Sequence, residues 1–399
     1  MAVITLHQPG AAKPEPTGLV LFSAGFRPFF LLASLWAASA LPLWLCIYTG
    51  TLALPSAMPP VTWHVHEMIF GFASATIAGF LLTAIPNWTG RLPLRGTPLA
   101  LLAILWLAGR IAVLISVALG APLAMAIDLA FPAVFVLVIA RELVAGKNWK
   151  NLPMLVALSL LFAGSLLVHL QVLGFTQTAG LGNRLGIATV LLLIALVGGR
   201  IVPSFTRNWL MKSRPEGRLP AQIGRFDLAA LLVTVTGLGA WVFDPQGDAT
   251  PWLERAAGAA CAARLARWCG LATFAEPLVF ILHAGYGWLA MGLLLLGVNG
   301  LYPLLPPTTA LHALTAGAIG TMTLAVMTRA TLGHTGRTLS AGRGTQAIYL
   351  LVTLGTVLRL LAPLAGAQAM TVTLFAGAAW SSAFALFALA YGPSLNRPR

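Results

Sequence analysis

Residues 28–48 read PFFLLASLWAASALPLWLCIY and contain no charged side chain. An apolar run of about 20 residues is long enough to cross the hydrocarbon core of a bilayer as one helix. Eleven further apolar runs follow along the chain. They cover residues 64–85, 98–119, 122–144, 152–173, 185–205, 226–243, 252–270, 275–297, 309–330, 345–365 and 370–391. The sequence therefore predicts an all-α, polytopic membrane protein with twelve transmembrane helices.

The composition excludes most classes of soluble protein. The 399 residues are 58% hydrophobic and only 9% charged, whereas about 25% of residues are charged in ordinary globular domains. So few charges cannot cover a water-facing surface, which excludes a soluble enzyme, a disordered protein and a coiled coil. The three scattered cysteines, Cys46, Cys261 and Cys269, form neither a disulfide framework nor a cysteine-based metal site. The seven histidines are therefore the main supply of transition-metal ligands.

The positive charge is distributed as a topology signal. The formal net charge is +14, but the Lys and Arg residues mostly stand in small groups at the ends of apolar runs, and no basic run with interleaved aromatics indicates a nucleic-acid groove. If all twelve runs cross, nearly all of these cations fall on one side, which places both termini in the cytoplasm. The run 252–270 is the least certain of the twelve to cross the membrane, because it contains three arginines. It is also compatible with an amphipathic helix that lies along the interface. Without it, however, the later cationic loops would face outward.

Both ends of the chain are expected to be short cytoplasmic tails. These are residues 1–27 and 392–399, and the transmembrane domain comprises residues 28–391. The N-terminal tail contains polar and proline residues, without the short apolar core and cleavage site of a signal peptide.

A faint internal repeat accompanies this topology. Three similar stretches each end an even-numbered helix and exit to the cytoplasm: residues 78–91 (AGFLLTAIPNWTGR), 197–209 (VGGRIVPSFTRNW) and 324–337 (LAVMTRATLGHTGR). Their spacing of roughly four helices predicts three four-helix units.

Six of the seven histidines lie within or beside the predicted spans. Ionisable side chains are costly in a bilayer, and they usually face the interior of the bundle or mark a functional path. His312 and His334 stand at opposite ends of one helix, roughly 33 Å apart, so they cannot bind one metal ion. Depth along the predicted helices instead indicates an outer cluster and an inner pair of metal ligands. The outer cluster is His64, His66, His169 and His312, and the inner pair is His283 and His334.

The pair His64 and His66 leaves two arrangements open. Residues i and i+2 of a helix point in nearly opposite directions. The two imidazoles therefore bind one metal only if the helix begins after His64; otherwise they serve different centres, or His64 is an interfacial residue in a turn. Glu67 adjoins His66 and is predicted to hold its tautomer or to relay protons in catalysis, the alternative being a partner for an interfacial arginine. Glu276, near His283, could likewise orient that histidine or relay protons. Its position at a helix end is the simpler explanation for a charged residue there.

Four arginines lie deep or nearly deep in the predicted spans. A guanidinium group matches a carboxylate with two hydrogen bonds, so Arg200 and Arg329 are candidates for pairing with haem propionates. Snorkelling to the cytoplasmic interface is the alternative and is preferred for Arg329. Arg110 lies in the middle of the run 98–119, without a partner that the sequence identifies. The fourth deep arginine is Arg359.

Several stretches resemble the NnrS family, which comprises bacterial membrane proteins associated with nitric oxide that contain haem and copper. The resemblance extends over nearly the whole chain in the family's order, and its most specific part combines HxHE with PNWTG. The matching stretches are residues 25–30 (GFRPFF), 63–68 (WHVHEM), 79–90 (GFLLTAIPNWTG), 198–203 (GGRIVP), 206–208 (TRN), 312–315 (HALT) and 333–337 (GHTGR). The resemblance implies a twelve-helix protein of the bacterial inner membrane that acts in nitric oxide detoxification or response. The histidines that fall in these stretches are His64, His66, His312 and His334.

Together, the histidines and the resemblance predict haem b and copper as cofactors and a nitric oxide reductase-like oxidoreductase as the activity. The expected partners are nitric oxide, the lipid bilayer and an electron donor that the sequence does not identify, with no nucleic acid. Twelve helices also look like the core subunit of haem–copper oxidases, at the level of the fold only. That family carries its copper-binding histidines on its sixth and seventh helices, and here those spans contain none. Two alternatives stay open: a transporter for haem, metal or a nitrogen oxide, and a non-catalytic scavenger or sensor of nitric oxide.

Overall fold

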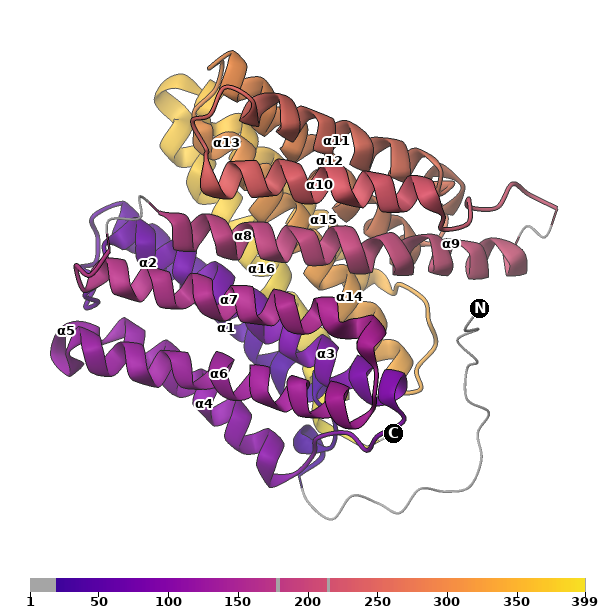
Figure 1. The fold of residues 1–399 in the computed structure, drawn as a ribbon, viewed down its shortest axis with the longest axis horizontal. Coiled ribbons are helices and arrows are strands. Elements are labelled where there is room, and N and C mark those ends of the chain that lie inside the picture. The colour runs from indigo at the N-terminus through magenta and orange to yellow at the C-terminus, as the bar shows by residue number, and fades with distance from the viewer. Residues whose placement is uncertain (1–18, 177–179, 214–215, 399) are drawn as a thin grey trace.

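The computed structural model describes residues 19–176, 180–213 and 216–398, and these form a helical bundle without strands. Most of the helices lie side by side, roughly along one direction (Figure 1). The helices of the first half are α1 (Phe26–Tyr48), α2 (Pro60–His66), α3 (Ser74–Thr89), α4 (Thr97–Leu114), α5 (Ser116–Leu119), α6 (Ala121–Ala145), α7 (Leu152–Val172), α8 (Leu181–Leu193) and α9 (Gly199–Ser213). Those of the second half are α10 (Arg225–Phe243), α11 (Thr250–Ala266), α12 (Pro277–Leu301), α13 (Pro307–His312), α14 (Gly320–His334), α15 (Arg343–Leu361) and α16 (Ala369–Asn396). The predicted all-α fold is confirmed.

Eleven helices of the described chain are long and apolar enough to cross a membrane, which makes this a polytopic membrane protein. The predicted run 252–270 corresponds to α11, which has only 17 residues and packs along α10 and α12. At the start of α1, Arg27 donates hydrogen bonds to the carbonyls of Ser394 and Leu395 near the end of α16. The described chain thus starts and ends at one end of the bundle, so an even number of crossings is required. This supports α11 as the twelfth crossing, while the number twelve and the cytoplasmic side of the ends stay predictions.

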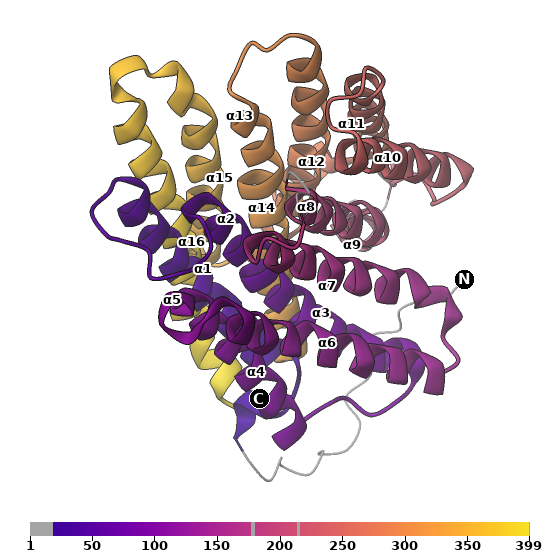
Figure 2. The same ribbon diagram turned by 60° about the vertical axis from the view of Figure 1, so that its left-hand side comes forward.

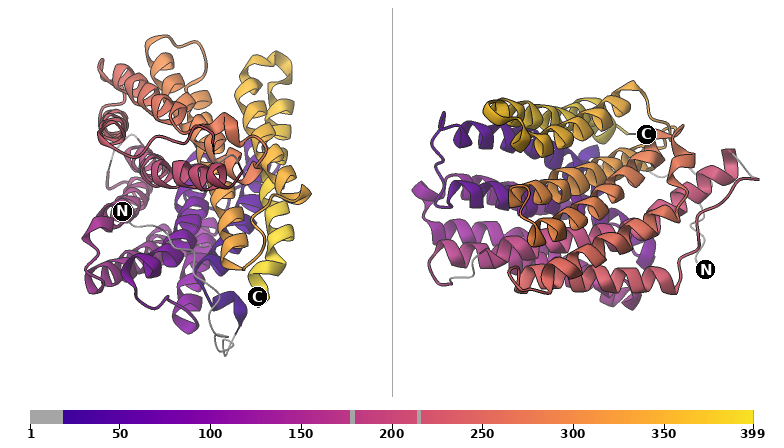
Figure 3. Two further views of the ribbon diagram at one scale, coloured as in Figure 1. Left: turned by 90° about the vertical axis from the view of Figure 1, so that its right-hand side faces the viewer. Right: turned by 90° about the horizontal axis from the view of Figure 1, so that it is seen from above.

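The predicted tails lie partly outside the described residues, which begin at residue 19. At the other end, α16 continues to Asn396, into the segment predicted as a tail. The first and last crossings are neighbours, because α1 packs against α16 (Figure 3). Between the α15–α16 pair and the α10–α11 pair lie α13 and α14 (Figure 2).

Three of the long crossings contain a π-helical segment between two α-helical parts. These segments are η2 (Glu67–Ala73) between α2 and α3, η4 (Ile194–Gly198) between α8 and α9, and η6 (Ala313–Ile319) between α13 and α14. The three repeated stretches of the sequence overlap or follow these segments. After η2 and η6, Gly90 and Gly336 stand at the same spacing, and both adopt a left-handed φ of 70°. The shared backbone pattern supports the prediction of three four-helix units.

Side chains of neighbouring helices bind the backbone of these π-helical segments. Trp106 of α4 donates from Nε1 to the carbonyl of Gly71 in η2, at 3.1 Å. Arg264 of α11 donates from Nη1 to the carbonyl of Ala195 in η4, at 3.0 Å. Such segments are frequent at functional sites, and here their carbonyls bind polar side chains in the interior of the bundle.

Candidate metal centre

Six polar side chains from the second to the fifth long crossings form one buried group. Each is at most 4% exposed to solvent, and they come from the junction of α2 with η2 and from α4, α6 and α7. Because lipid offers no hydrogen bonds, buried polar groups in a membrane protein must satisfy one another or bind a ligand. The members of this group are His66, Glu67, Arg110, Asp128, Ser165 and His169.

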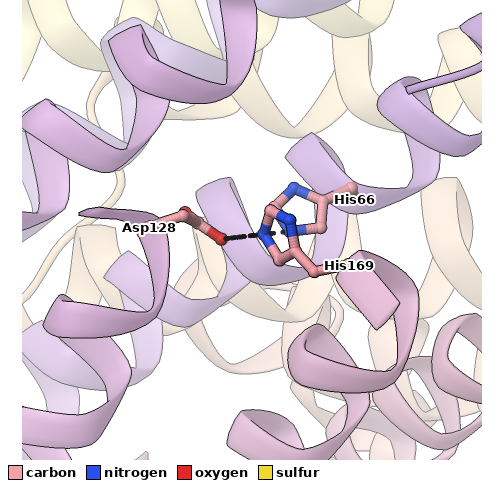
Figure 4. Close-up of side chains that lie close together, drawn as sticks. All are labelled: His66, Asp128 and His169. Carbon is pink, nitrogen blue, oxygen red and sulfur yellow. Dashed lines mark hydrogen bonds and ion pairs between the residues drawn. The ribbon is translucent and has the colours of Figure 1, made fainter. Parts of the chain in front are cut away.

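His66, Asp128 and His169 bring three ligand atoms within 4.8 Å of one another. Oδ2 of Asp128 lies 2.9 Å from Nε2 of His169 and 3.3 Å from Nε2 of His66. The two imidazoles face this carboxylate from α7 and from the end of α2 (Figure 4). Two imidazole nitrogens and one carboxylate oxygen form a donor set that suits transition-metal ions such as copper and iron.

Glu67 and Arg110 form hydrogen bonds to the metal-binding side chains and fix their positions. Oε1 of Glu67 lies 3.1 Å from Nδ1 of His66, so that Nδ1 donates to the carboxylate and the lone pair of Nε2 points toward Asp128. Nη1 of Arg110 lies 2.8 Å from both oxygens of Glu67, and its Nη2 binds Oδ1 of Asp128. One oxygen of Asp128 therefore contacts Arg110, and the other contacts the two histidines.

The charge of the group favours one further cation. With neutral imidazoles, the guanidinium of Arg110 and the carboxylates of Glu67 and Asp128 sum to one negative charge. A net charge in the interior of a membrane bundle is costly. A metal cation, or a proton in its place, removes that cost. The hydroxyl of Ser165, 3.3 Å from Nε2 of His66 and 3.4 Å from Oδ2 of Asp128, adds a further oxygen beside the donor atoms.

Two glycines make room for these side chains. A Cβ at Gly71 would lie 2.9 Å from Nη1 of Arg110 and 3.1 Å from Oε2 of Glu67. A Cβ at Gly109 would lie 2.9 Å from Oδ1 of Asp128. Both positions therefore require the smallest residue for the ion pairs to keep their geometry.

The comparison with known families decides the identity. The model of the NnrS protein family matches residues 20–399, which is nearly the whole chain. The chain belongs to the NnrS family. No curated protein matched this NnrS sequence.

In this NnrS protein, the four histidines predicted as an outer cluster divide into two groups. His66 and His169 join Asp128 in the centre described above. His64 instead stacks on Trp44, with ring centroids 4.7 Å apart and an interplanar angle of 13°. The reason is the course of α2, which begins at Pro60 and continues through both histidines, so that their side chains point in nearly opposite directions. The arrangement in which the helix begins after His64 is thereby excluded, and with it joint binding by the two imidazoles.

The two inner histidines have different neighbours. Nε2 of His283 lies 2.7 Å from Oγ1 of Thr206, whereas the ring of His334 packs 5.4 Å from that of Phe26. Their roles as metal ligands stay predictions. Glu276 caps the start of α12, where its side chain accepts a hydrogen bond from the backbone at 3.2 Å, in agreement with the helix-end explanation.

The arginines predicted to pair with haem propionates lie outside the buried group. Arg200 is exposed, and Arg329 stacks over the ring of Phe205, with Cζ 4.1 Å from the centroid. Neither forms an ion pair with a carboxylate of the described residues. Both roles stay predictions.

The sequence reasoning missed Asp128, which supplies both the metal-binding oxygen and a partner for Arg110. A signal was present, because Asp128 is the one acidic residue in the middle of the apolar run 122–144. A lone carboxylate in a transmembrane helix is by default a functional residue. Its partners on α4 and α7 become visible only once the helices are packed.

A small, partly open apolar cavity of about 90 Å³ lies between α3, α8, η4 and α14. The threonines in its wall use their hydroxyls internally. The hydroxyl of Thr76 has the carbonyl of Phe72 and the sulfur of Met327 as acceptors, and that of Thr323 donates to the carbonyl of Gly320. A buried water needs two to four polar partners, which this wall does not offer. The cavity therefore suits a small apolar molecule.

Proposed function

We propose that this protein holds haem and copper in the bacterial inner membrane and that it binds and reduces nitric oxide. The observation that supports the metal part most directly is the buried group of two imidazoles and one carboxylate, whose ligand atoms all lie within 4.8 Å of one another. The NnrS family membership supports the link to nitric oxide. The apolar cavity agrees with a small, weakly polar substrate.

In this proposal His66, His169 and Asp128 hold the copper ion. When bound, copper supplies a redox-active Lewis acid that attracts nitric oxide and its reduced forms. Glu67 keeps the hydrogen of His66 on Nδ1, which leaves Nε2 available as a ligand. Arg110 binds both carboxylates and fixes their positions. The contacts of Glu67 favour this positioning role, and its role as a proton relay stays a prediction.

The proposed reaction joins two molecules of nitric oxide. Two electrons and two protons are consumed, the N–N bond forms, one N–O bond breaks, and nitrous oxide and water leave. The electrons come from an external electron donor, which the sequence and the structure do not identify. The protons enter through polar side chains of the bundle, of which Glu67 and Ser165 lie beside the metal ligands.

Metal analysis of the detergent-purified protein tests the centre. We expect one copper ion per chain in addition to haem iron, and its loss in Asp128→Asn and His169→Gln. The control is Asp248→Asn, which makes the same chemical change at an exposed carboxylate and is expected to keep the copper. Wild-type protein that takes up no copper would contradict the assignment.

Product analysis tests the reaction. Reduced protein supplied with nitric oxide is expected to release nitrous oxide, measured by gas chromatography, and Asp128→Asn is expected to release far less. Spectral shifts without nitrous oxide would instead identify a scavenger or sensor. A colourless wild-type protein free of metal would favour a transporter.

A further inference from the structure

A groove with charged side chains in its wall lies at one end of the bundle. It contains a space of about 680 Å³ between the segment that joins α3 to α4 and the last turns of α6. In that segment, the backbone N–H of Gly96 donates to the carbonyl of Phe22, at 2.8 Å, so the groove lies at the end where the described chain starts and ends. Arg141 of the groove follows Asp128 of the metal centre by 13 residues on α6, which is roughly 20 Å along the helix. The groove is therefore a separate site.

One carboxylate orders two of the guanidinium groups in this groove. Oε2 of Glu142 accepts a hydrogen bond from Nε of Arg91, at 2.6 Å, and its Oε1 accepts one from Nε of Arg141, at 2.9 Å. The side chain of Glu142 is only 14% exposed, whereas those of Arg91 and Arg141 are 42% and 62% exposed. The guanidinium groups, and not the carboxylate, therefore face the surroundings. Holding them in place before a ligand arrives reduces the entropy that binding costs.

The groove has an excess of positive charge. A third arginine, Arg95, lies in its wall and forms no ion pair with a carboxylate in the described part of the chain. Three guanidinium groups and one carboxylate leave a net charge of two positive. Arginines at helix ends also act as topology signals, but that role requires neither a common groove nor a shared carboxylate. Because a guanidinium binds phosphate oxygens with two hydrogen bonds, the groove suits a phosphate-bearing anion.

The groove lies at the level of lipid headgroups. α3 ends at Thr89 and α4 begins at Thr97, so its wall is the connection between two crossings, and Arg141 is in the last two turns of a third. Trp149, four residues beyond the end of α6, is 60% exposed. Exposed tryptophans of this kind are typical of the interface between membrane and water.

The helices beside the groove present apolar side chains to the outside. α4 and α6 pack against each other at one edge of the bundle (Figure 1). Leu92, in the wall of the groove, is 84% exposed. The apolar side chains of α4 and α6 that are at least half exposed include Leu101, Ile104, Ile111, Leu137 and Val144. Acyl chains attached to a phosphate in the groove would cover these side chains, which a free phosphate ion would leave uncovered.

We propose that this groove binds the headgroup of an anionic phospholipid, with the phosphates on Arg91, Arg95 and Arg141 and the acyl chains along α4 and α6. Cardiolipin, which has two phosphates, matches the two net positive charges of the groove. Basic pockets between transmembrane helices are known to bind headgroups of this kind. The inference does not depend on the proposed metal centre or its reaction.

Thermal unfolding of the purified, delipidated protein in detergent tests the proposal. The protein is mixed with cardiolipin, with phosphatidylcholine or with inorganic phosphate, at one phosphate concentration. We expect cardiolipin to raise the unfolding temperature, because a ligand that binds only the folded state stabilises it. We expect no rise with phosphatidylcholine, which has no net charge, or with inorganic phosphate, which has no acyl chains. An equal rise with inorganic phosphate would identify a site for free phosphate and overturn the lipid assignment.

Two matched triple variants separate the groove from the general positive charge of the protein. The groove variant combines Arg91→Gln, Arg95→Gln and Arg141→Gln. The control combines Arg218→Gln, Arg225→Gln and Arg343→Gln, at exposed positions outside the groove. Each variant loses three positive charges. We expect the groove variant to lose the cardiolipin shift and the control to keep it. Equal shifts in both would mean that net charge alone attracts the lipid, which would overturn the site.

Native mass spectrometry provides a second readout on the wild-type protein, which does not depend on how the variants fold. In an equimolar mixture of cardiolipin and phosphatidylcholine, we expect one cardiolipin per chain to stay bound in preference to phosphatidylcholine. Equal retention of the two lipids would overturn the proposal. Without lipid, both triple variants are expected to unfold close to the wild-type temperature, because exposed ion pairs contribute little to stability.

Discussion

Arg110 binds both carboxylate oxygens of Glu67 through one guanidinium nitrogen, Nη1, at 2.8 Å each. Its other terminal nitrogen binds Asp128. One cation thereby contacts two carboxylates that reach the interior of the bundle from different helices. Since Glu67 contacts His66 and Asp128 contacts His169, the position of Arg110 determines the positions of both imidazoles.

Replacing Arg110 by Gln is expected to be strongly destabilising. The change leaves two buried carboxylates without a compensating charge, and breaking a buried ion pair costs about 3–5 kcal/mol. The free energy of unfolding in detergent measures the loss. Glu67→Gln in the Arg110→Gln background is expected to restore part of it, because one of the uncompensated charges is then removed.

Arg95→Gln is the control for this prediction. Arg95 is exposed in the segment between α3 and α4, so its replacement is expected to change the unfolding free energy by less than about 0.5 kcal/mol. Equal effects of the two substitutions would mean that Arg110 is not needed to compensate the buried carboxylates.

Gly71→Ala is expected to disturb the metal centre indirectly, by displacing Arg110. The added Cβ would meet Nη1 of Arg110 at 2.9 Å and Nε1 of Trp36 at 3.1 Å, so the guanidinium must move away from Glu67. Overpacking of this kind costs about 1–3 kcal/mol. We expect both a lower unfolding temperature and a weaker affinity for copper, measured by competition with a chelator.

Gly239→Ala provides the matched comparison. A Cβ at this position of α10 has nothing within 4 Å, and alanine is favoured over glycine in a helix by up to about 1 kcal/mol. It is expected to leave copper affinity unchanged and stability equal or slightly higher. A loss of copper in this variant would contradict the local explanation for Gly71.

The course of the helices could be predicted well from the sequence, because the length of an apolar run is a local property. The runs 28–48 and 226–243 agree with α1 and α10 to within two residues. The π-helical segments could not be predicted, because they depend on how the backbone of one helix meets side chains of its neighbours, as Gly71 meets Trp106. The run 252–270 stayed ambiguous because its arginines find partners only in the packed bundle: Arg264 binds Asp227 and Tyr286.

The candidate site could be predicted in part. The number and depth of the histidines indicated metal ligands, and the two-residue spacing of His64 and His66 raised the possibility of two centres. Which histidines belong together depends on the direction of each side chain around its helix, and so on the residue at which α2 begins. Asp128 could not be assigned from the sequence because its role depends on contacts with Arg110 of α4 and His169 of α7. These contacts join residues that are far apart in the sequence.

Copper is expected to stabilise the folded protein through the first centre. A ligand that binds only the folded state stabilises it by about 2.7 kcal/mol at a hundredfold excess over its dissociation constant. Thermal unfolding of metal-depleted protein is therefore expected to shift upward on addition of copper. The shift is expected to vanish in Asp128→Asn and to persist in Asp248→Asn, and equal shifts in the two variants would rule out this centre as the binding site.

Val190→Phe is expected to fill the apolar cavity. Val190 is buried in its wall, and the larger ring occupies space that a small apolar molecule would use. Xenon is a probe for such cavities because it binds dry apolar space without hydrogen bonds. We expect the ¹²⁹Xe NMR signal to show binding to the wild-type protein and loss of that binding in Val190→Phe. The matched variant Val233→Phe makes the same change on α10 at a side chain that is 37% exposed and is expected to keep xenon binding. If xenon binds Val190→Phe as well as wild type, the gas occupies another site, and the cavity between α3, α8, η4 and α14 does not take up small apolar molecules.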